Sequence, residues 1–299
     1  MNPRHALLLS TLLCYGLAVS SQAHAFDLGN ALKDAVKQQT GGEATTGSEV
    51  QTPAGSASTQ TSFNWKSPSP EEEMALGRQL AGNLLGAAPL VKDAKLQAYV
   101  NQVGRWVASQ TDRQQLAWHF GVIDSDDLNA FATPGGYILI TKGLYRKLDN
   151  EAQLAGVLGH EVAHVVKKHH LKVLQKSQLL NLGASVIGDK VGKGDQTLDK
   201  VIGSGAEMMA RGLDKDAEYE ADRVGVALSV RAGYDGYGLP EVLQTLGQVN
   251  QSDDSVTLLF KTHPSPEDRL TRLGDAIGSR LDGVNEGKLL ADRFYRLPK

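Results

Sequence analysis

The pattern of apolar and polar positions along the chain predicts a mainly helical α+β fold. Its clearest helix begins after Asn150, a residue type that caps helix N-termini, and continues to residues 167–168. Apolar side chains cover a broad surface of this segment rather than a narrow stripe: Leu154, Val157, Leu158, Val162, Val165 and Val166. We therefore expect this helix to be buried in the core.

Further periodic segments predict four other helices and a small sheet. The helices are expected from Pro70 to about residue 85, over 215–230, over 240–248 and over 266–277. Two β-rich runs cover 117–123 and 136–141, and turn residues at 133–136 separate the second run from 129–132. This predicts a small antiparallel sheet packed on helices. An edge strand of such a sheet is as compatible with binding an extended peptide as with a purely structural hairpin.

The first 25 residues have the features of a secretory signal peptide. A positive charge at Arg4 precedes the apolar stretch 6–19, and Ala23-His24-Ala25 provides a small-x-small cleavage pattern. A short membrane anchor is the alternative, but the apolar run is brief. We expect residues 1–25 to be removed on export to the periplasm. No later segment approaches the roughly 18 apolar residues of a transmembrane span, so none is expected in the mature chain.

The amino-acid composition distinguishes an N-terminal linker from one globular domain. Residues 26–65 are expected to form a short amphipathic helix and a flexible linker, because 40–64 has few large apolar side chains whose burial could offset the entropy of ordering. One globular domain is expected over 66–299. The net charge of −3 offers no basic surface for nucleic acid. The only cysteine, Cys14, lies in the leader, so the mature domain must be stable without disulfides.

His160-Glu161-Val162-Ala163-His164 carries the most specific chemistry in the chain. Histidines four residues apart lie about 40° from each other around a helix, so both imidazoles can bind one zinc ion. Glu161 lies about 60° from His164, where a carboxylate can act as a base beside the metal. The pattern can also arise by chance on a surface helix. The apolar context favours a metal site, because polar side chains inside a buried helix need partners.

A catalytic zinc takes three protein ligands, so another must lie elsewhere in the chain. Glu218 and Asp222 are the best candidates, since they share one face of the predicted helix 215–230. We interpret them as a ligand and as an acceptor for the outer N–H of a ligating histidine. Glu220 points away from them and is expected to be solvated. An ordinary acidic helix start is the alternative interpretation.

The remaining histidines are less informative. His169 and His170 follow two lysines at the predicted end of a helix, so we expect them to be solvated and to have no metal role. His263 precedes a proline and so lies in an extended or turn segment, while Arg269 lies in the helix that follows. The two side chains can reach one pocket, although a single loop histidine is more often simply solvated.

Four groups of residues carry a resemblance to a known family. They are Asn129-Ala130-Phe131-Ala132 with Pro134-Gly135-Gly136, His160-Glu161-x-x-His164, Glu218-x-x-x-Asp222 and Thr262-His263-Pro264. Over roughly residues 68–280 the chain resembles the HtpX and CAAX-prenyl-protease family of zinc peptidases, and in particular its soluble exported bacterial branch of the BepA/LoiP type. The resemblance implies a compact zincin-like (gluzincin) fold, with Zn²⁺ held by His160, His164 and Glu218 and with Glu161 as general base.

The same resemblance implies active-site roles for two later residues. His263 is expected to cover the zinc as a gate, as a further ligand at rest, and Arg269 to contact substrate or the developing oxyanion. Membrane relatives have spanning helices where this chain has the apolar runs 173–187 and 201–209. These runs are too short and too interrupted to span a membrane, so within 171–213 we expect a lid or wall over the cleft.

Together these features predict a periplasmic zinc endopeptidase that hydrolyses polypeptides. Misfolded outer-membrane proteins or their assembly machinery are the expected partners. One alternative is a chaperone or assembly factor whose zinc site is normally closed by His263, so that cleavage is rare. Another is a purely structural zinc, with four fixed protein ligands and no open position.

Overall fold

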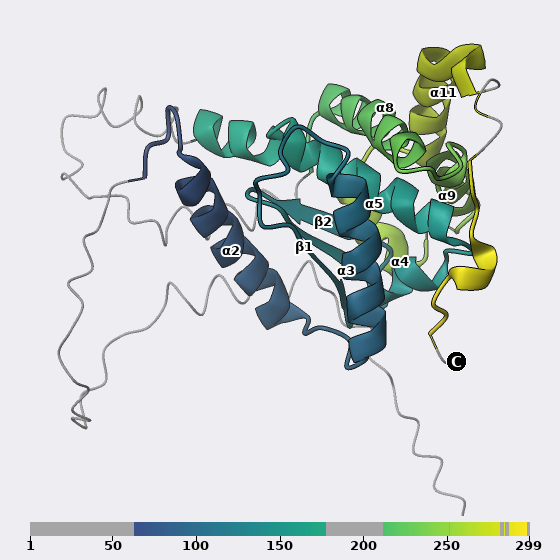
Figure 1. Cartoon of the computed structure of the whole chain (residues 1–299), viewed down its shortest axis with the longest axis horizontal. Coiled ribbons are helices and arrows are strands. Elements are labelled where there is room, and N and C mark those ends of the chain that lie inside the picture. The colour runs from purple at the N-terminus through teal and green to yellow at the C-terminus, as the bar shows by residue number, and fades with distance from the viewer. Residues whose placement is uncertain (1–62, 178–211, 251, 282–283, 285–286, 298–299) are drawn as a thin grey trace, which may run out of the picture.

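The computed structural model describes residues 63–177, 212–250, 252–281, 284 and 287–297 (Figure 1). The predicted leader, the linker up to residue 62 and most of the predicted lid lie outside these ranges. Figure 1 shows the described elements as helices gathered around one small sheet. Within the described ranges, no helix combines the length and the apolar character needed to cross a membrane.

Helices α2 (Pro70–Ala87) and α3 (Ala94–Ala108) pack against the sheet. Helix α2 begins where the sequence predicts, because Ser69 and Glu72 form a capping box. Ser69 Oγ accepts from Glu72 N at 3.2 Å, and the Glu72 carboxylate accepts from Ser69 N at 2.7 Å. Helix α3 has no counterpart among the predicted elements; Asp93 caps it by accepting two backbone N–H groups.

The sheet has three strands in the order β1-β3-β2. They are β1 (His119–Ile123), β2 (Ala130–Thr133) and β3 (Tyr137–Thr141). Strands β2 and β3 form the predicted antiparallel hairpin, but β1 pairs with β3 in parallel. The prediction of an antiparallel sheet is therefore wrong for β1. The cause is that β3 returns between two strands that run in opposite directions, and the hydrophobic pattern does not show which strand is central.

Helix α5 (Glu151–Val166) runs through the middle of the molecule (Figure 1). The sheet and α3 lie on one side of it, and helices α8 (Lys215–Arg231) and α9 (Gly238–Gly247) pack on the other. Every residue from Glu151 to Val165 is buried, which confirms the prediction of a core helix. Asn150 caps α5 by accepting the N–H of Gln153 at 2.9 Å. The short helix α4 (Lys142–Arg146) connects β3 to this part of the chain.

The C-terminal part of the chain supplies four more helices. They are α8 (Lys215–Arg231), α9 (Gly238–Gly247), α10 (Thr257–Thr262) and α11 (Pro266–Ile277), with short 3₁₀ turns at Asp254–Val256, Gly278–Leu281 and Ala291–Arg293. Helices α8, α9 and α11 confirm the three helices predicted for this region. Side chains from α9 and Phe294 join those of α3, α5 and the sheet in the main apolar core.

Two glycines allow α5 and α8 to approach each other closely. A Cβ atom at Gly159 would lie 2.7 Å from Gly225 O, and a Cβ atom at Gly225 would lie 2.6 Å from His160 N. Cβ atoms do not approach backbone atoms this closely, so both positions require glycine. Asp222 and Glu218 lie one and two turns before Gly225. The close contact therefore brings the acidic face of α8 to the histidines of α5.

Candidate metal centre

Helix α5 presents both histidines of the H-E-x-x-H motif to one point. His160 Nε2 and His164 Nε2 lie 3.0 Å apart, with the ring planes at 85°. Both side chains are buried, as is Glu161. Two nitrogens bound tetrahedrally to zinc at 2.0–2.1 Å are about 3.3 Å apart, so one ion can bind both.

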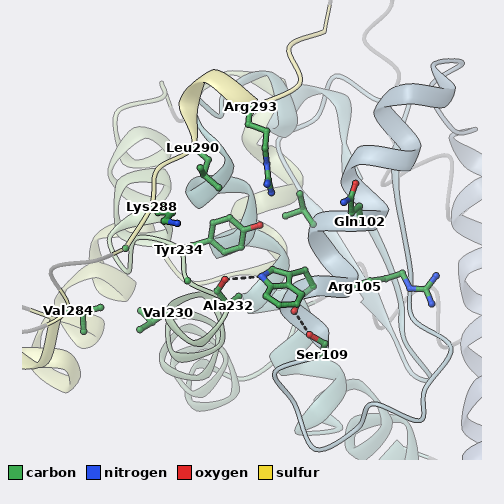
Figure 2. A pocket seen from close by; sticks show the side chains of 14 residues that line it. Gln102, Arg105, Ser109, Val230, Ala232, Tyr234, Val284, Lys288, Leu290 and Arg293 are labelled. Carbon is green, nitrogen blue, oxygen red and sulfur yellow. Dashed lines mark hydrogen bonds between the residues drawn. The ribbon is translucent and has the colours of Figure 1, made fainter.

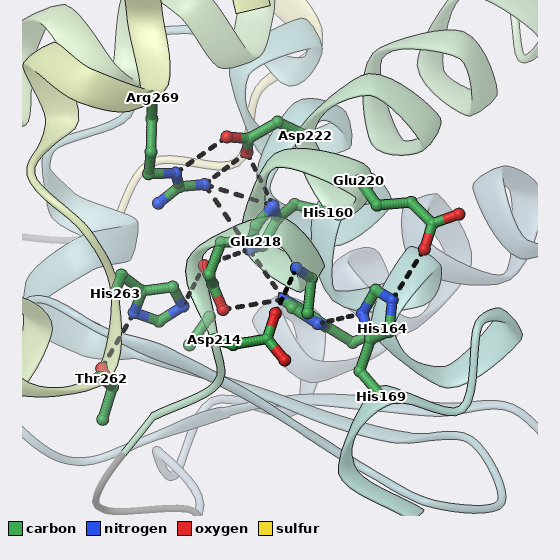
Figure 3. A network of polar contacts seen from close by, with 12 residues as sticks. His160, His164, His169, Asp214, Glu218, Glu220, Asp222, Thr262, His263 and Arg269 are labelled. Carbon is green, nitrogen blue, oxygen red and sulfur yellow. Dashed lines mark hydrogen bonds and ion pairs between the residues drawn. The ribbon is translucent and has the colours of Figure 1, made fainter. Parts of the chain in front are cut away.

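Helix α8 adds two carboxylates, which contact opposite sides of the histidine rings (Figure 3). Glu218 Oε1 lies 3.5 Å from His164 Nε2, and Glu218 Oε2 lies 3.6 Å from His160 Nε2. One turn later, Asp222 Oδ1 lies 2.8 Å from His160 Nδ1. Glu218 therefore faces the nitrogens that are free to bind a metal. Asp222 faces the outer nitrogen of His160.

The segment around α10 and α11 closes the site. His263 follows α10 directly, and its Nε2 lies 3.7 Å from Glu218 Oε2. Arg269 on α11 binds Asp222 through Nε–Oδ2 at 3.0 Å and Nη2–Oδ1 at 2.5 Å. The structure thus brings together every residue predicted for the site: His160, Glu161, His164, Glu218, Asp222, His263 and Arg269. The guanidinium of Arg269 is committed to Asp222, so its predicted contact with substrate stays a prediction.

The side chains present fit a zinc ion. One possible ligand atom from each of His160, His164, Glu218 and His263 lies within 4.8 Å of the others. Glu218 Oε2 is buried and has no hydrogen-bond partner among the described residues. A buried carboxylate oxygen without a partner is costly unless a cation binds it. Imidazole nitrogens and a carboxylate oxygen are ligands that zinc prefers.

Comparison with known families decides the identity of this arrangement. The model of peptidase family M48 matches residues 94–277, which is more than half of the chain. The chain belongs to peptidase family M48. The match confirms the resemblance to zinc peptidases, and the metallopeptidases of the M48 family depend on zinc.

Several individual proteins are similar to this M48 chain. The beta-barrel assembly-enhancing protease of Escherichia coli (strain K12) is 31% identical over 209 residues, which cover 67% of this chain and 42% of that protein. The mitochondrial metalloendopeptidase OMA1 of Arabidopsis thaliana is 29% identical over 169 residues, covering 56% and 33%. Metalloprotease YcaL of Escherichia coli (strain K12) is 27% identical over 162 residues, covering 54% and 63%. The chain spans about two fifths of the length of the beta-barrel assembly-enhancing proteases that it matches.

The electrostatics of the M48 site favour a positive charge between the two histidines. Burial and Arg269 lower the pKa of His160, but Asp222 and Glu218 outweigh them and raise it to about 9. Asp222 can only accept a hydrogen bond and lies closer to His160 Nδ1 than Arg269 Nη2 does, at 2.8 Å against 3.2 Å. A proton therefore occupies Nδ1, and the extra proton on Nε2 points at His164. A metal cation would replace that proton.

The neighbouring groups have protonation states suited to metal-assisted hydrolysis. Burial raises the pKa of Glu161 to about 7, so this carboxyl group can both accept and return a proton near neutrality. Burial and the nearby histidines lower the pKa of His164 well below its usual value, which keeps the imidazole neutral as a ligand must be. Burial opposes ionisation of Glu218, but His263 and His160 hold its pKa at about 2.

The expectation that His169 is solvated is wrong, and His170 is only partly exposed and lines a cavity beside Glu218. Glu220 reaches the solvent as expected, but it also contacts His169. Helix α5 ends at Val166, and the chain passes through Lys168, whose φ of 57° lies in the left-handed region, before it becomes helical again. His169 is consequently buried, with Nδ1 2.9 Å from His164 Nδ1 and Nε2 3.1 Å from Glu220 Oε2. The projection of one continuous helix places His169 on the wrong side because it does not include this turn.

A small cavity of about 20 Å³ lies beside Glu161 and Glu218. Ala130–Ala132 of β2 forms one wall, and residues 212–213 and 262–263 form another. Strand β2 lies at the edge of the sheet and pairs only with β3 among the described strands. A cavity of this size holds about one water molecule. This cavity is therefore too small to hold a polypeptide.

A much larger cavity lies away from this centre (Figure 2). It has a volume of about 890 Å³ and lies between α3, the end of α8 and the C-terminal segment. Trp106 lines it, and the indole N–H donates to Ala232 O at 2.8 Å. The described residues of the lining include Arg105 and Lys288 but no histidine and no carboxylate. This cavity therefore lacks the groups that a metallopeptidase site needs.

Proposed function

We propose that this chain is a zinc-dependent endopeptidase that acts on polypeptides in the periplasm. The observation that carries the proposal is the convergence of His160, His164, Glu218 and His263 beside Glu161, with Glu218 Oε2 buried and lacking a hydrogen bond from the described residues. Membership of peptidase family M48 supports it. The signal-like pattern over residues 1–25 supports export.

Each side chain has one task in the proposed reaction. His160, His164 and Glu218 would hold the zinc, which when bound makes a water molecule more acidic and polarises the scissile carbonyl. Glu161 takes the proton from the attacking water and returns it to the leaving amine, and its raised pKa of about 7 suits both steps. Asp222 holds the outer N–H of His160, which leaves His160 Nε2 directed at the metal position.

The edge of the sheet suggests how a substrate is held. Strand β2 lines the cavity beside Glu161, and its outer edge has no described strand as a partner. An extended polypeptide that adds to such an edge is held by main-chain hydrogen bonds, which makes sequence selectivity loose. Relatives at about 30% identity are named beta-barrel assembly-enhancing proteases. We therefore propose unfolded outer-membrane proteins as substrates and their assembly machinery as partner.

The closed cavity favours a second candidate function, that of a chaperone or assembly factor with rare cleavage. The cavity of about 20 Å³ admits no polypeptide, and His263 lies against Glu218 at 3.7 Å, where its imidazole can occupy the position that water needs. In this view His263 is a gate. The two functions differ in whether the site opens when an unfolded polypeptide is present.

The test combines metal analysis of the mature protein with cleavage of a disordered polypeptide, with and without a chelator. Wild type should contain zinc and should cleave, and the chelator should stop cleavage. Glu161→Gln should keep zinc and fold but lose hydrolysis, because an amide of the same shape is not a base. Cleavage by Glu161→Gln at a rate comparable to wild type would overturn the proposal. A wild type that never cleaves but suppresses aggregation would favour the chaperone.

His263→Ala separates a gate from a substrate-binding group. If His263 covers the metal at rest, its removal should raise basal cleavage of an unfolded substrate at full zinc occupancy. Lower cleavage by the same variant would reject the gate. Glu218→Gln provides the contrast, since a neutral amide is a poorer ligand and zinc content itself should fall.

A further inference from the structure

The outer nitrogen of His164 contacts another histidine instead of a carboxylate. His164 Nδ1 lies 2.9 Å from His169 Nδ1, and His169 Nε2 lies 3.1 Å from Glu220 Oε2 (Figure 3). Glu220 Oε1 in turn lies 2.9 Å from Lys167 Nζ. These contacts form one line from the protein surface to the candidate metal position. We call the three side chains Lys167, Glu220 and His169 the relay.

The direction of every hydrogen bond in the relay follows from Glu220. An ionised carboxylate can only accept, so His169 carries its proton on Nε2. His169 Nδ1 is then a bare acceptor, which requires His164 to carry its proton on Nδ1. That tautomer leaves a lone pair on His164 Nε2, the nitrogen that lies 3.5 Å from Glu218 Oε1. One carboxylate therefore fixes the tautomers of two histidines in sequence.

Burial changes steadily along the relay. His164 and His169 are 2% and 5% exposed, whereas the side chains of Glu220 and Lys167 are 36% and 39% exposed. The imidazoles need partners because buried N–H groups without them are costly. Glu220 is reachable from solvent and can be replaced without opening the core. The relay therefore offers a way to change the orientation of a ligand from the surface.

His169 is not itself placed to bind the metal. The four side chains whose ligand atoms converge are His160, His164, Glu218 and His263, and His169 is not among them. Its Nδ1 contacts the nitrogen of His164 that faces away from the metal position, and its Nε2 contacts Glu220. The contacts of His169 are those of a group that orients a ligand.

We propose that His169 and Glu220 are positioning residues that hold His164 in the tautomer and orientation needed to bind zinc, and so raise the affinity of the site for the metal. The inference rests on the zinc site of the proposed function but does not require that the protein hydrolyses peptides. Lys167 contributes only by steadying Glu220, since the ion pair between them is partly exposed.

The test measures zinc affinity by competition with a chromophoric chelator. His169→Phe keeps a ring in the core but removes the acceptor, and zinc affinity should fall about 10- to 100-fold. His169→Gln restores an acceptor oxygen and should recover most of the loss. Lys176→Ala, at an exposed position of the same helical segment, is the control and should bind zinc as wild type does. Wild-type affinity in His169→Phe, or equal losses in the Phe and Gln variants, would overturn the proposal.

Glu220 gives a second test that does not disturb the core. Glu220→Ala should weaken zinc binding several-fold, while Glu220→Gln keeps an acceptor oxygen and should stay close to wild type. Asp216→Asn, at an exposed position about one helical turn before Glu220 on α8, is the matched control. Unchanged zinc affinity in Glu220→Ala would reject the relay.

The test of the relay and the test of endopeptidase activity can give different outcomes, so failure of one can be distinguished from failure of the other. If His169→Phe loses zinc affinity while wild type never cleaves a polypeptide, the relay stands and the endopeptidase does not. If wild type cleaves and His169→Phe binds zinc as tightly as wild type, the endopeptidase stands and the relay is rejected.

Discussion

The two histidines of α5 are supported in different ways. His160 contacts Asp222, which Arg269 holds in turn, and these three residues are at most 5% exposed. His164 contacts His169 and then Glu220, which reaches the solvent. Breaking a buried ion pair strands a charge in the core, whereas an exposed pair contributes little to stability. We call Asp222 and Arg269 the buried support of His160, and His169 and Glu220 the second support, that of His164. The buried support is part of the fold, whereas the exposed end of the second support can be changed at little cost to the free energy of unfolding.

Among the changes to the two supports, removal of Arg269 should lower the free energy of unfolding the most. Arg269→Met roughly conserves the stem of the side chain but leaves the Asp222 carboxylate buried without its cation. We expect the free energy of unfolding to fall by about 3–5 kcal/mol, measured by urea unfolding of the metal-free protein. Arg272→Met on the same helix is the control; its guanidinium is exposed and lies 5.6 Å from the centre of the Tyr219 ring, so its loss should change stability by at most about 1 kcal/mol. Similar losses in both variants would mean that the buried support is not a structural element.

Gly225→Ala should disturb both supports at once. The added Cβ would lie 2.6 Å from His160 N, so α5 and α8 must separate and carry Glu218 and Asp222 away from the histidines. Overpacking of this kind costs about 1–3 kcal/mol. Zinc affinity should fall together with stability. Gly274→Ala on α11 is the matched control: nothing lies within 4 Å of its Cβ, so the better helix propensity of alanine should stabilise the protein. A gain in stability in both variants would show that the glycine contact is not needed.

Asp222→Asn tests the buried support without a change of shape. The amide oxygen can still accept from His160 Nδ1, but the charge that raises the basicity of the ring is lost. We expect a loss of about 10- to 100-fold in zinc affinity or activity. Glu220→Gln, the corresponding change in the other support, should lose less. A larger loss for Glu220→Gln than for Asp222→Asn in the same chelator competition would reverse the ranking of the two supports.

Lys167→Ala should have the smallest effect. The ion pair with Glu220 is more than a third exposed on both sides, so its loss should change the free energy of unfolding by at most about 1 kcal/mol. Any difference from wild type in zinc affinity should shrink as salt is raised to 1 M, because exposed charges are screened. A difference that persists at high salt would show that Lys167 acts through a contact other than this pair.

The parts of the site that could be predicted are those fixed by the period of a single helix. His160 and His164 share a face because they are four residues apart, and the same spacing places Glu218 and Asp222 together on α8. Local spacing does not show how two helices meet, so the contact between His169 and Glu220, 51 positions apart, could not be found in this way. The family match adds what local spacing lacks, since it relates the motifs to one another.

Two features of the fold also could not be predicted from local spacing in the sequence. The left-handed conformation of Lys168 has no signal in the residue type, because lysine has no preference for positive φ. The parallel pairing of β1 with β3 depends on which strand lies in the centre, and alternation of apolar residues is the same in either arrangement. In contrast, Ser69 and Asn150 fix the starts of α2 and α5 through hydrogen bonds to residues three positions away, which sequence does show.

The small cavity beside Glu161 has a consequence for the rate of metal exchange. Residues 212–213 and 262–263 line it, and its volume is about 20 Å³, while a second cavity of about 30 Å³ lies beside His160, Glu161 and His263. Both cavities are small, so we expect a bound ion to leave no faster than the surrounding residues move, however strong the competing chelator. At high chelator concentration the rate of zinc loss should become independent of that concentration, as expected when a conformational step is limiting. That limiting rate would measure how often the site opens, and a polypeptide must enter through the same opening.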